Sequence, residues 1–265
     1  MSATVELDDV AVGYPGRVLW SGLDLVIEPG EFVAVLGGNG TGKTTMLKAL
    51  LGLIPPRAGS IKVLGEAPSR GDRRVGYVPQ HAAFNPDAPI RGVDLVRLGA
   101  DGHRFGPRRV STSIRDRVDA SLAAVGAQQY ATAPVGLLSG GEQQRLRIAS
   151  AIVDDPALIL ADEPLLSLDL ASQRQVADVL DARRRAVGAA VVVVTHDVNP
   201  VLRHVNRVVY LAAGRWAAGT PEEVLTSERL STLYGLDVDV VRVRDNVVIV
   251  GAPDEATGPH HHGGS

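Results

Sequence analysis

Eight consecutive residues combine glycines with a lysine and a hydroxyl side chain, in the pattern G-x-x-x-x-G-K-[ST]. They are Gly37, Gly38, Asn39, Gly40, Thr41, Gly42, Lys43 and Thr44. Glycines permit backbone angles at which successive N–H groups point into one concave site, and such a site attracts anions. Lys43 would reach the β- and γ-phosphates of a nucleotide, and the Thr44 hydroxyl would bind Mg²⁺. The segment predicts a phosphate-binding loop, against the alternative of a glycine-rich turn.

The segments on either side of this loop match the elements that the motif requires. Residues 32–36 are an apolar run predicted as a strand. From Gly42 a helix is predicted, with Met46, Leu47, Leu50 and Leu51 on one face. A helix that begins beside the loop adds the positive end of its dipole to an anion site. The order strand, loop, helix therefore favours phosphate binding over a turn.

Two acids follow another apolar run. Residues 158–161 are apolar and lead directly into Asp162 and Glu163. Acids at the carboxyl end of a buried strand lie where doubly wound sheets bind their ligands. Asp162 suits the Mg²⁺ shell, through a water molecule, and Glu163 suits a general base for an attacking water. Two such acids alone more often begin a loop, but the phosphate loop upstream favours the functional interpretation.

The pattern of apolar runs predicts an α/β fold. Residues 158–161 and 191–194 are apolar throughout, as expected of central parallel strands that are buried on both faces. Residues 5–12 and 23–27 alternate in part, as half-exposed antiparallel strands do. Residues from about 85 to 137 carry arginines, glycines and helical spacing, which predicts an inserted helical subdomain.

The C-terminal part is expected to add a short helix and two strands. The strand-like runs are residues 238–243 and 247–250, and the polar tail after Gly251 is predicted to be disordered. The tail contains His260, His261 and His262. Imidazoles could bind a transition metal there; a cloning remnant or an uncommitted polar tail is the alternative.

The bulk composition is that of an ordinary globular protein. The 265 residues carry a formal net charge of −3, which does not favour a nucleic-acid partner. The absence of cysteine excludes disulfides and thiolate metal sites. No apolar stretch approaches the roughly 18 residues of a membrane span, and the acidic N-terminus is unlike a signal peptide. If the protein acts at a membrane, we expect another chain to supply the spans.

One further motif points to a family. Residues 138–145, Leu-Ser-Gly-Gly-Glu-Gln-Gln-Arg, closely resemble the LSGGQ signature of ABC ATPases. The spacing from Ser139 to Glu142 also predicts a helix capping box. Both interpretations can hold, because a helix N-terminus at Gly140 and Gly141 with bare N–H groups attracts a γ-phosphate. Glu142 stands where the family usually has Gln, and its carboxylate would weaken nucleotide binding slightly or simply cap the helix.

Other residues match the plan of this family in order and spacing. By this resemblance Gln80 contacts Mg²⁺ and senses the transporter partner, and His196 contacts the γ-phosphate. Tyr14 is similar to the aromatic residue that stacks on adenine, and Asp169 lies in a segment that resembles the D-loop, residues 167–169. The residues expected to contact ATP are Tyr14, Gly37, Gly38, Asn39, Gly40, Thr41, Gly42, Lys43, Thr44, Thr45, Ser139, Gly140, Gly141, Glu142 and Asp169. Those expected at Mg²⁺ are Thr44, Gln80 and Asp162, and the catalytic residues are Glu163, His196 and Lys43.

The resemblance covers about residues 4–225 and implies both a fold and a mechanism. The fold is a P-loop NTPase core with a mostly parallel sheet, an N-terminal antiparallel β subdomain and a helical subdomain inserted at about 85–150. An ATPase domain of residues 1–225 would be followed by an extension, 226–251, and a disordered tail, 252–265. Family members work as head-to-tail pairs, in which the signature of one copy closes over the ATP and Mg²⁺ held by the other. A homodimer is expected.

Several segments are most similar to the ATPases of bacterial zinc and manganese importers. They are residues 77–81, 85–90 and 93–96, together with the signature that contains Glu142. The resemblance implies transmembrane permease subunits and a substrate-binding protein as partners, at the cytoplasmic face of a bacterial membrane. Siderophore and cobalamin importers share much of this pattern, and an exporter with a separate membrane subunit is another alternative. A soluble ABC ATPase of translation or repair would need a second ATPase domain or a long coiled coil, and neither is found in this sequence.

Overall fold

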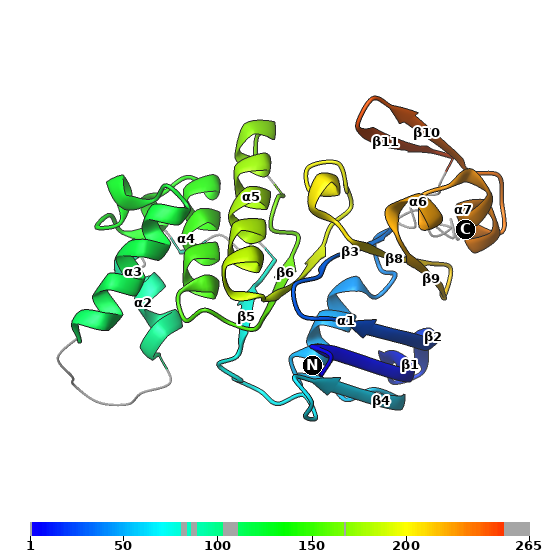
Figure 1. Cartoon of the computed structure of the whole chain (residues 1–265), viewed down its shortest axis with the longest axis horizontal. Coiled ribbons are helices and arrows are strands. Elements are labelled where there is room, and N and C mark those ends of the chain that lie inside the picture. Colours follow the sequence, from blue (N-terminus) through cyan, green and yellow to red (C-terminus); the bar gives the residue numbers. More distant parts are fainter. Residues whose placement is uncertain (1, 81–83, 86–88, 103–110, 167, 252–265) are drawn as a thin grey trace, which may run out of the picture.

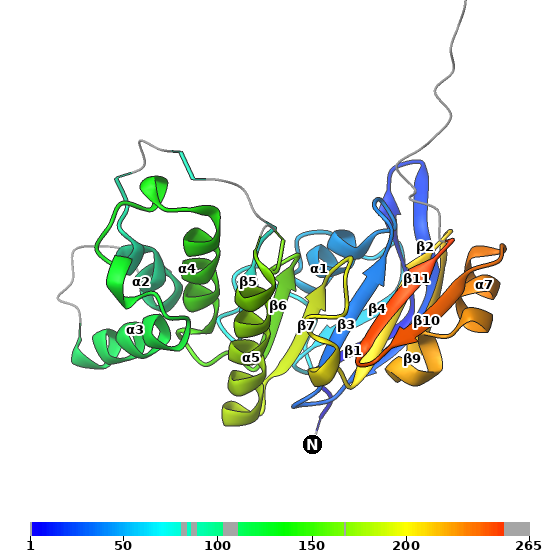
Figure 2. The same cartoon turned by 90° about the horizontal axis from the view of Figure 1, so that it is seen from above.

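The computed structural model describes residues 2–80, 84–85, 89–102, 111–166 and 168–251. A six-stranded sheet in the order β5-β6-β7-β3-β8-β9 forms its centre (Figures 1 and 2). All neighbouring strands are parallel except β9, which runs antiparallel to β8. The strands are β3 (Phe32–Gly37), β5 (Val75–Val78), β6 (Leu158–Asp162), β7 (Ala190–Val194), β8 (Arg207–Ala212) and β9 (Arg215–Gly219). The three strands predicted from unbroken apolar runs are therefore central neighbours in one sheet, as expected.

A separate antiparallel sheet in the order β2-β1-β4 carries the N-terminal segment. Its strands are β1 (Val5–Tyr14), β2 (Arg17–Ile27) and β4 (Ala58–Val63). The β1–β2 hairpin closes with Tyr14 opposite Arg17, and Gly16 in the turn has a φ of 82°. Helix α1 (Lys43–Leu50) packs between this sheet and the central sheet (Figure 1). The hairpin tip and the start of α1 thereby lie near each other.

Helices gather beside the β5 edge of the central sheet (Figure 2). They are α2 (Gly92–Asp101), α3 (Thr112–Ala124), the short 3₁₀ turns η1 (Gln128–Tyr130) and η2 (Val135–Leu137), and α4 (Gly140–Ile152). This group is the predicted helical insertion. The long helix α5 (Leu170–Val187) covers the sheet next to it. The predicted fold class is confirmed by this arrangement.

The C-terminal extension packs at the opposite end of the sheet (Figure 1). It contains α7 (Ser227–Tyr234), β10 (Asp239–Val243) and β11 (Asn246–Val250), and it follows the short helix α6 (Pro221–Val224). The 3₁₀ turn η3 (Leu202–His204) lies between β7 and β8, and its His204 contacts α5. Strands β10 and β11 pair only with each other, at the two runs expected to be strands. The tail of residues 252–265 and its three histidines lie outside the described residues. The division into an ATPase domain, 1–225, an extension, 226–251, and a tail stays a prediction.

The central sheet separates two hydrophobic clusters. Phe32, Ala34 and Leu36 of β3 face a cluster that includes the helical insertion and the C-terminal extension. Val33 and Val35 face a second cluster, which contains α1 and the antiparallel sheet. Successive strand residues point to opposite faces, so one unbroken apolar strand supplies both clusters. Within the described part of the chain, no helix is long and apolar enough to cross a membrane.

Candidate nucleotide-binding site

The phosphate loop is held closed by its own lysine. Lys43 Nζ donates hydrogen bonds to the carbonyl oxygens of Gly37 and Gly38, at 2.7 and 2.8 Å. The Thr41 hydroxyl also donates to Gly38 O, at 2.9 Å. Gly42 caps α1 with a φ of 101°, in the left-handed region that favours glycine. The loop therefore sets backbone N–H groups and a buried ammonium at the N-terminus of a helix, which is an anion site.

Gly37 has no room for a side chain. Its φ is 143°, and a Cβ added there would lie 2.2 Å from the carbonyl oxygen of Leu211 on β8. The loop can thus pack directly against the neighbouring strand. This close approach is a physical reason for glycine at the first position of the motif.

A cavity of about 360 Å³ lies against the loop. It is lined by Tyr14, Arg17, Leu19, Asn39, Gly40, Gly42, Lys43, Thr44, Thr45, Gln80 and Glu163. Nine of these eleven residues are among those predicted for the site, and they come from the hairpin tip, the loop, α1, the end of β5 and the end of β6. Tyr14 is 47% exposed, and its hydroxyl lies 3.2 Å from Thr45 Oγ1. The structure therefore leaves an aromatic face beside the loop, where the resemblance expects adenine.

Asp162 has the character of a metal-binding carboxylate. It is fully buried at the end of β6, and the Thr44 hydroxyl donates a hydrogen bond to its Oδ1 at 3.1 Å. Its Oδ2 has no hydrogen-bond partner among the described residues. A buried carboxylate oxygen without a partner is costly, and a hard cation satisfies it. Mg²⁺ prefers a few protein oxygens together with phosphate oxygens and water, so Thr44 and Asp162 fit this ion.

The described residues contain no cluster of three or more histidine, cysteine, aspartate or glutamate side chains that could hold a metal alone. A cation at Asp162 would therefore depend on phosphate oxygens for much of its shell. Gln80 is exposed and lines the same cavity. Its role as a further Mg²⁺ ligand stays a prediction.

Glu163 and His196 form a pair at the edge of the cavity. Glu163 Oε2 lies 3.0 Å from His196 Nδ1. Glu163 has a φ of 49°, which is unusual for a residue with a side chain. Its N–H donates to the carbonyl oxygen of Val194 on β7, at 2.9 Å. This bond fixes the turn that directs the carboxylate out of the sheet and into the cavity, where it can accept a proton from water.

The signature residues do not line this cavity. Ser139 caps α4, and its hydroxyl accepts a hydrogen bond from the Glu142 N–H. Glu142 Oε2 accepts from both the N–H and the hydroxyl of Ser139, each at 2.8 Å. The capping box is therefore confirmed, whereas the contact of Ser139, Gly140, Gly141 and Glu142 with a phosphate stays a prediction.

Asp169 does not line the cavity either, and it caps the N-terminus of α5. Its carboxylate accepts hydrogen bonds from the N–H and the hydroxyl of Ser172, both at 2.9 Å. These bonds hold the pKa of Asp169 below its usual value. Ser167, which was expected in the same loop, lies outside the described residues. The predicted site residues therefore fall into two groups: those at the cavity, and the signature residues and Asp169, which do not line it.

Comparison with known proteins assigns this arrangement to a family. A family model described as "ABC transporter" matches residues 20–166, which is more than half of the chain. The chain belongs to the ABC transporter family. The zinc import ATP-binding protein ZnuC of Pseudomonas fluorescens is 32% identical to this ABC subunit, over 98% of this chain and 88% of the relative. The manganese transport system ATP-binding protein MntB of Bacillus subtilis is 32% identical over 87% of this chain and 92% of the relative.

A solved structure shows the same fold. It is an inward-facing ABC transporter, assigned provisionally to the metal-chelate type, and it matches this ABC subunit with a TM-score of 0.78 at 27% identity. The match covers 94% of this chain and 96% of the other. The ABC subunit is therefore an ATP-binding and ATP-hydrolysing protein, homologous to the ATPases of zinc and manganese importers.

Sequence reasoning missed two residues of the cavity of the ABC subunit, Arg17 and Leu19. Arg17 pairs with Tyr14 across the β1–β2 turn. A two-residue turn, Pro15-Gly16, separates them in the sequence. Such a turn predicts a β-hairpin, in which Tyr14 and Arg17 face each other across the two strands. Because Tyr14 was expected at the nucleotide, the turn would have predicted Arg17 near it as well.

The buried charge of Asp162 should lower the stability of the ABC subunit without ligands. Burial raises the pKa of Asp162, and the nearby Glu163 adds to the rise while Thr44 and Lys43 oppose it. A carboxyl group whose pKa is higher in the folded than in the unfolded chain costs stability above the raised pKa. This cost disappears as the pH falls through the raised value.

We therefore expect Asp162→Asn to raise the melting temperature of the metal-free protein at pH 7 by about 2–4 °C, and to remove Mg²⁺-dependent hydrolysis. Calorimetry in EDTA over a pH series measures the first effect, and phosphate release measures the second. The stability difference should shrink as the pH falls, because protonated Asp162 is neutral. A lower melting temperature at every pH, or retained hydrolysis with Mg²⁺, would contradict this account.

Proposed function

We propose that the ABC subunit is the ATPase of a bacterial importer of transition-metal ions, zinc or manganese. The observation that carries this proposal is the joint placement of the phosphate loop, Asp162 and Glu163 around one cavity. The named relatives act on zinc and manganese and are similar over nearly the whole chain. The cargo is thus proposed from similarity, and the ATPase chemistry from the geometry of the site.

The residues in and beside the cavity divide the steps of the proposed reaction among them. Lys43 and the loop N–H groups hold the phosphates, and Tyr14 offers its ring face to adenine. Bound Mg²⁺ would neutralise phosphate charge, and Thr44 and Asp162 would hold it. Glu163 takes the proton of the attacking water. The proposed partner of the γ-phosphate is His196, and its contact with Glu163 supports this role.

A second copy would complete the site. Ser139, Gly140 and Gly141 lie at the N-terminus of α4 and do not line the cavity of their own chain. Placed over the nucleotide of another copy, they would meet the γ-phosphate with the positive end of a helix. Bound ATP then favours the closed dimer, because its γ-phosphate contacts both copies. Hydrolysis releases this phosphate and removes the contact between the two copies. We therefore propose a head-to-tail homodimer.

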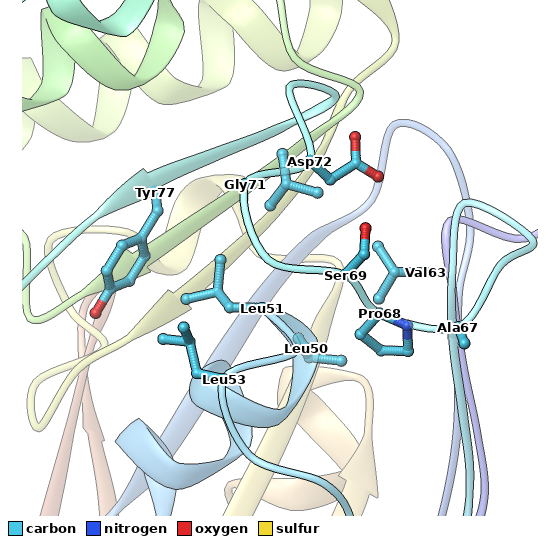
Figure 3. Close-up of a pocket in the computed structure, with 11 residues that line it drawn as sticks. Leu50, Leu51, Leu53, Val63, Ala67, Pro68, Ser69, Gly71, Asp72 and Tyr77 are labelled. Atoms are coloured by element: carbon cyan, nitrogen blue, oxygen red, sulfur yellow. The ribbon is translucent and has the colours of Figure 1, made fainter. Parts of the chain in front are cut away.

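A groove between α1 and the helical insertion suits a permease subunit. Two adjoining cavities of about 240 and 290 Å³ share Gly71, Asp72, Val75 and Tyr77. Figure 3 shows Leu50, Leu51, Leu53, Pro68, Ser69 and Tyr77 around the first cavity. The second cavity continues to Leu98 and Gly99 on α2. Tyr77 lies three residues before Gln80, so the groove adjoins the strand that leads to the nucleotide site.

We propose that a cytoplasmic segment of a membrane-spanning permease docks in this groove. The chain would then work at the cytoplasmic face of the membrane, with a substrate-binding protein on the other side. The apolar lining supports such a contact, since Leu53 and Leu98 are 41% and 52% exposed. No nucleic-acid partner is proposed.

Metal uptake by living cells tests the proposed cargo. A bacterium that loses this subunit should take up zinc or manganese several-fold more slowly, because the permease then has no ATPase. Uptake of radioactive ⁶⁵Zn and ⁵⁴Mn measures the rate. The wild-type chain should restore it, and Glu163→Gln should not. Normal uptake of both metals in the deletion strain, with loss of another cargo, would overturn the cargo and leave the ATPase assignment intact.

A further inference from the structure

The side chain of Asn199 joins the loop of His196 to the C-terminal hairpin. Asn199 Nδ2 donates a hydrogen bond to the carbonyl oxygen of Val247 at 3.0 Å. The Val247 N–H donates in return to Asn199 Oδ1, at 2.7 Å. A side-chain amide thus pairs with the main chain of β11 as a neighbouring strand would. Both polar groups of Val247 point at Asn199, so they take no part in the β10–β11 ladder.

The same side chain is fixed to the loop next to His196. Asn199 also donates from Nδ2 and from its backbone N–H to Asp197 Oδ1, at 2.8 and 2.9 Å. Asp197 in turn is tied to Thr195, whose hydroxyl donates to Asp197 O at 2.9 Å. Thr195 is buried, and its N–H donates to Val35 O on β3. His196 therefore sits between one residue fixed to the sheet and one fixed through Asn199 to the hairpin.

The direction of the His196 side chain depends on this support. The side chain is 60% exposed, and the hydrogen bond that the described structure gives it is the one to Glu163. An exposed ring with little packing takes its position from the backbone of its loop. The backbone on its C-terminal side is held by the bonds of Asp197 and Asn199.

The hairpin has a second, independent attachment. The Val240 N–H of β10 donates to the Ser227 hydroxyl, at 2.8 Å, at the start of α7. Val247 is 5% exposed and belongs to the hydrophobic cluster that includes Leu230 and Leu233 of α7, whereas Val241 and Val248 are about half exposed. Arg242 of β10 also donates to the carbonyl oxygen of Pro221, at 3.4 Å, at the start of α6. The hairpin is thus held by one contact to the His196 loop and by others to α6 and α7.

We infer that Asn199 is a positioning residue for ATP hydrolysis, through which the β10–β11 hairpin holds His196 beside Glu163. The inference rests on the proposed role of His196 and adds a function for the C-terminal extension. Asn199 lies outside the set of residues that line the nucleotide cavity. Its loss should therefore reduce the rate of hydrolysis and leave nucleotide binding unchanged.

Steady-state kinetics of the purified full chain test the inference. We expect Asn199→Ala to lower kcat about tenfold, because small misplacements of a catalytic group have effects of this size or larger. KM for ATP should stay within about twofold of the wild-type value. Val247→Pro removes the N–H group that donates to Asn199 Oδ1. Proline is tolerated at the edge of a sheet, so this variant should fold and should lower kcat by a similar factor. The double variant should be no slower than the slower single variant, because both changes break one link.

Ser227→Ala is the matched control, since it removes an attachment of the hairpin that does not involve the His196 loop. It should leave kcat within about twofold of wild type. An Asn199→Ala chain with unchanged kcat, beside an active wild type and an inactive Glu163→Gln, would overturn the inference alone. Equal losses in Asn199→Ala and Ser227→Ala, or additive losses in the double variant, would also overturn it. A wild-type chain without ATPase activity, or an active Glu163→Gln chain, would overturn the proposed function itself.

Discussion

Replacing Glu163 by Gln should reduce ATP hydrolysis by at least about a hundredfold, the size expected when a general base is removed. The change keeps the shape of the side chain and leaves an amide oxygen near His196 Nδ1, where Oε2 now lies at 3.0 Å. ATP binding should persist, since Lys43 and the phosphate loop are untouched. Because nucleotide then stays intact, the variant should accumulate as an ATP-bound dimer.

Size-exclusion chromatography with and without ATP and Mg²⁺ measures this dimer, and phosphate release measures the activity. Glu6→Gln is a matched control, because Glu6 pairs with Lys62 on the surface of the antiparallel sheet, far from the cavity. It should hydrolyse ATP as wild type does and show no stable dimer. Activity retained in Glu163→Gln would remove this residue from the role of base. Lost activity without a dimer would mean that the permease is needed for closure.

Replacing Lys43 by Ala should weaken ATP binding by about ten- to a hundredfold, because a hydrogen bond to a charged group is worth ~1.5–3 kcal/mol. Lys43 is 7% exposed and bonds to the carbonyl oxygens of Gly37 and Gly38. The variant loses the phosphate contact and also the bonds that close the loop. Both effects act on binding, so the loss should appear in the dissociation constant of ATP.

Calorimetric titration with ATP measures this change. Lys48→Ala is the matched control, because Lys48 lies on the same helix and does not line the cavity. It removes the same charge and should leave the affinity within about twofold. If Lys43→Ala and Lys48→Ala weaken binding equally, the effect comes from net charge and not from the loop.

The parts of the site that depend on neighbouring residues were predictable from the sequence. The phosphate loop begins at the end of β3, and Asp162 ends β6 with Glu163 directly after it, so an apolar run and a motif were enough to place each. The capping box of Ser139 and Glu142 was predictable for the same reason, because its two partners are three residues apart.

The parts that depend on distant contacts were not predictable. The bond between Asn199 and Val247 spans 48 residues, and no local pattern marks either partner. The left-handed conformation of Glu163 and the unpartnered Oδ2 of Asp162 arise only when β6 and β7 are side by side. Periodicity gives the face on which a residue lies, but not the atom that it meets across the fold.

The division of the core by the central sheet affects how this protein can change in evolution. Phe32 and Val33 are adjacent in β3 but belong to different hydrophobic clusters. Close-packed interiors respond to a change of volume mainly among the residues in contact. Substitutions in the helical insertion and the C-terminal hairpin should therefore be tolerated with little repacking of the cluster behind α1 and the phosphate loop.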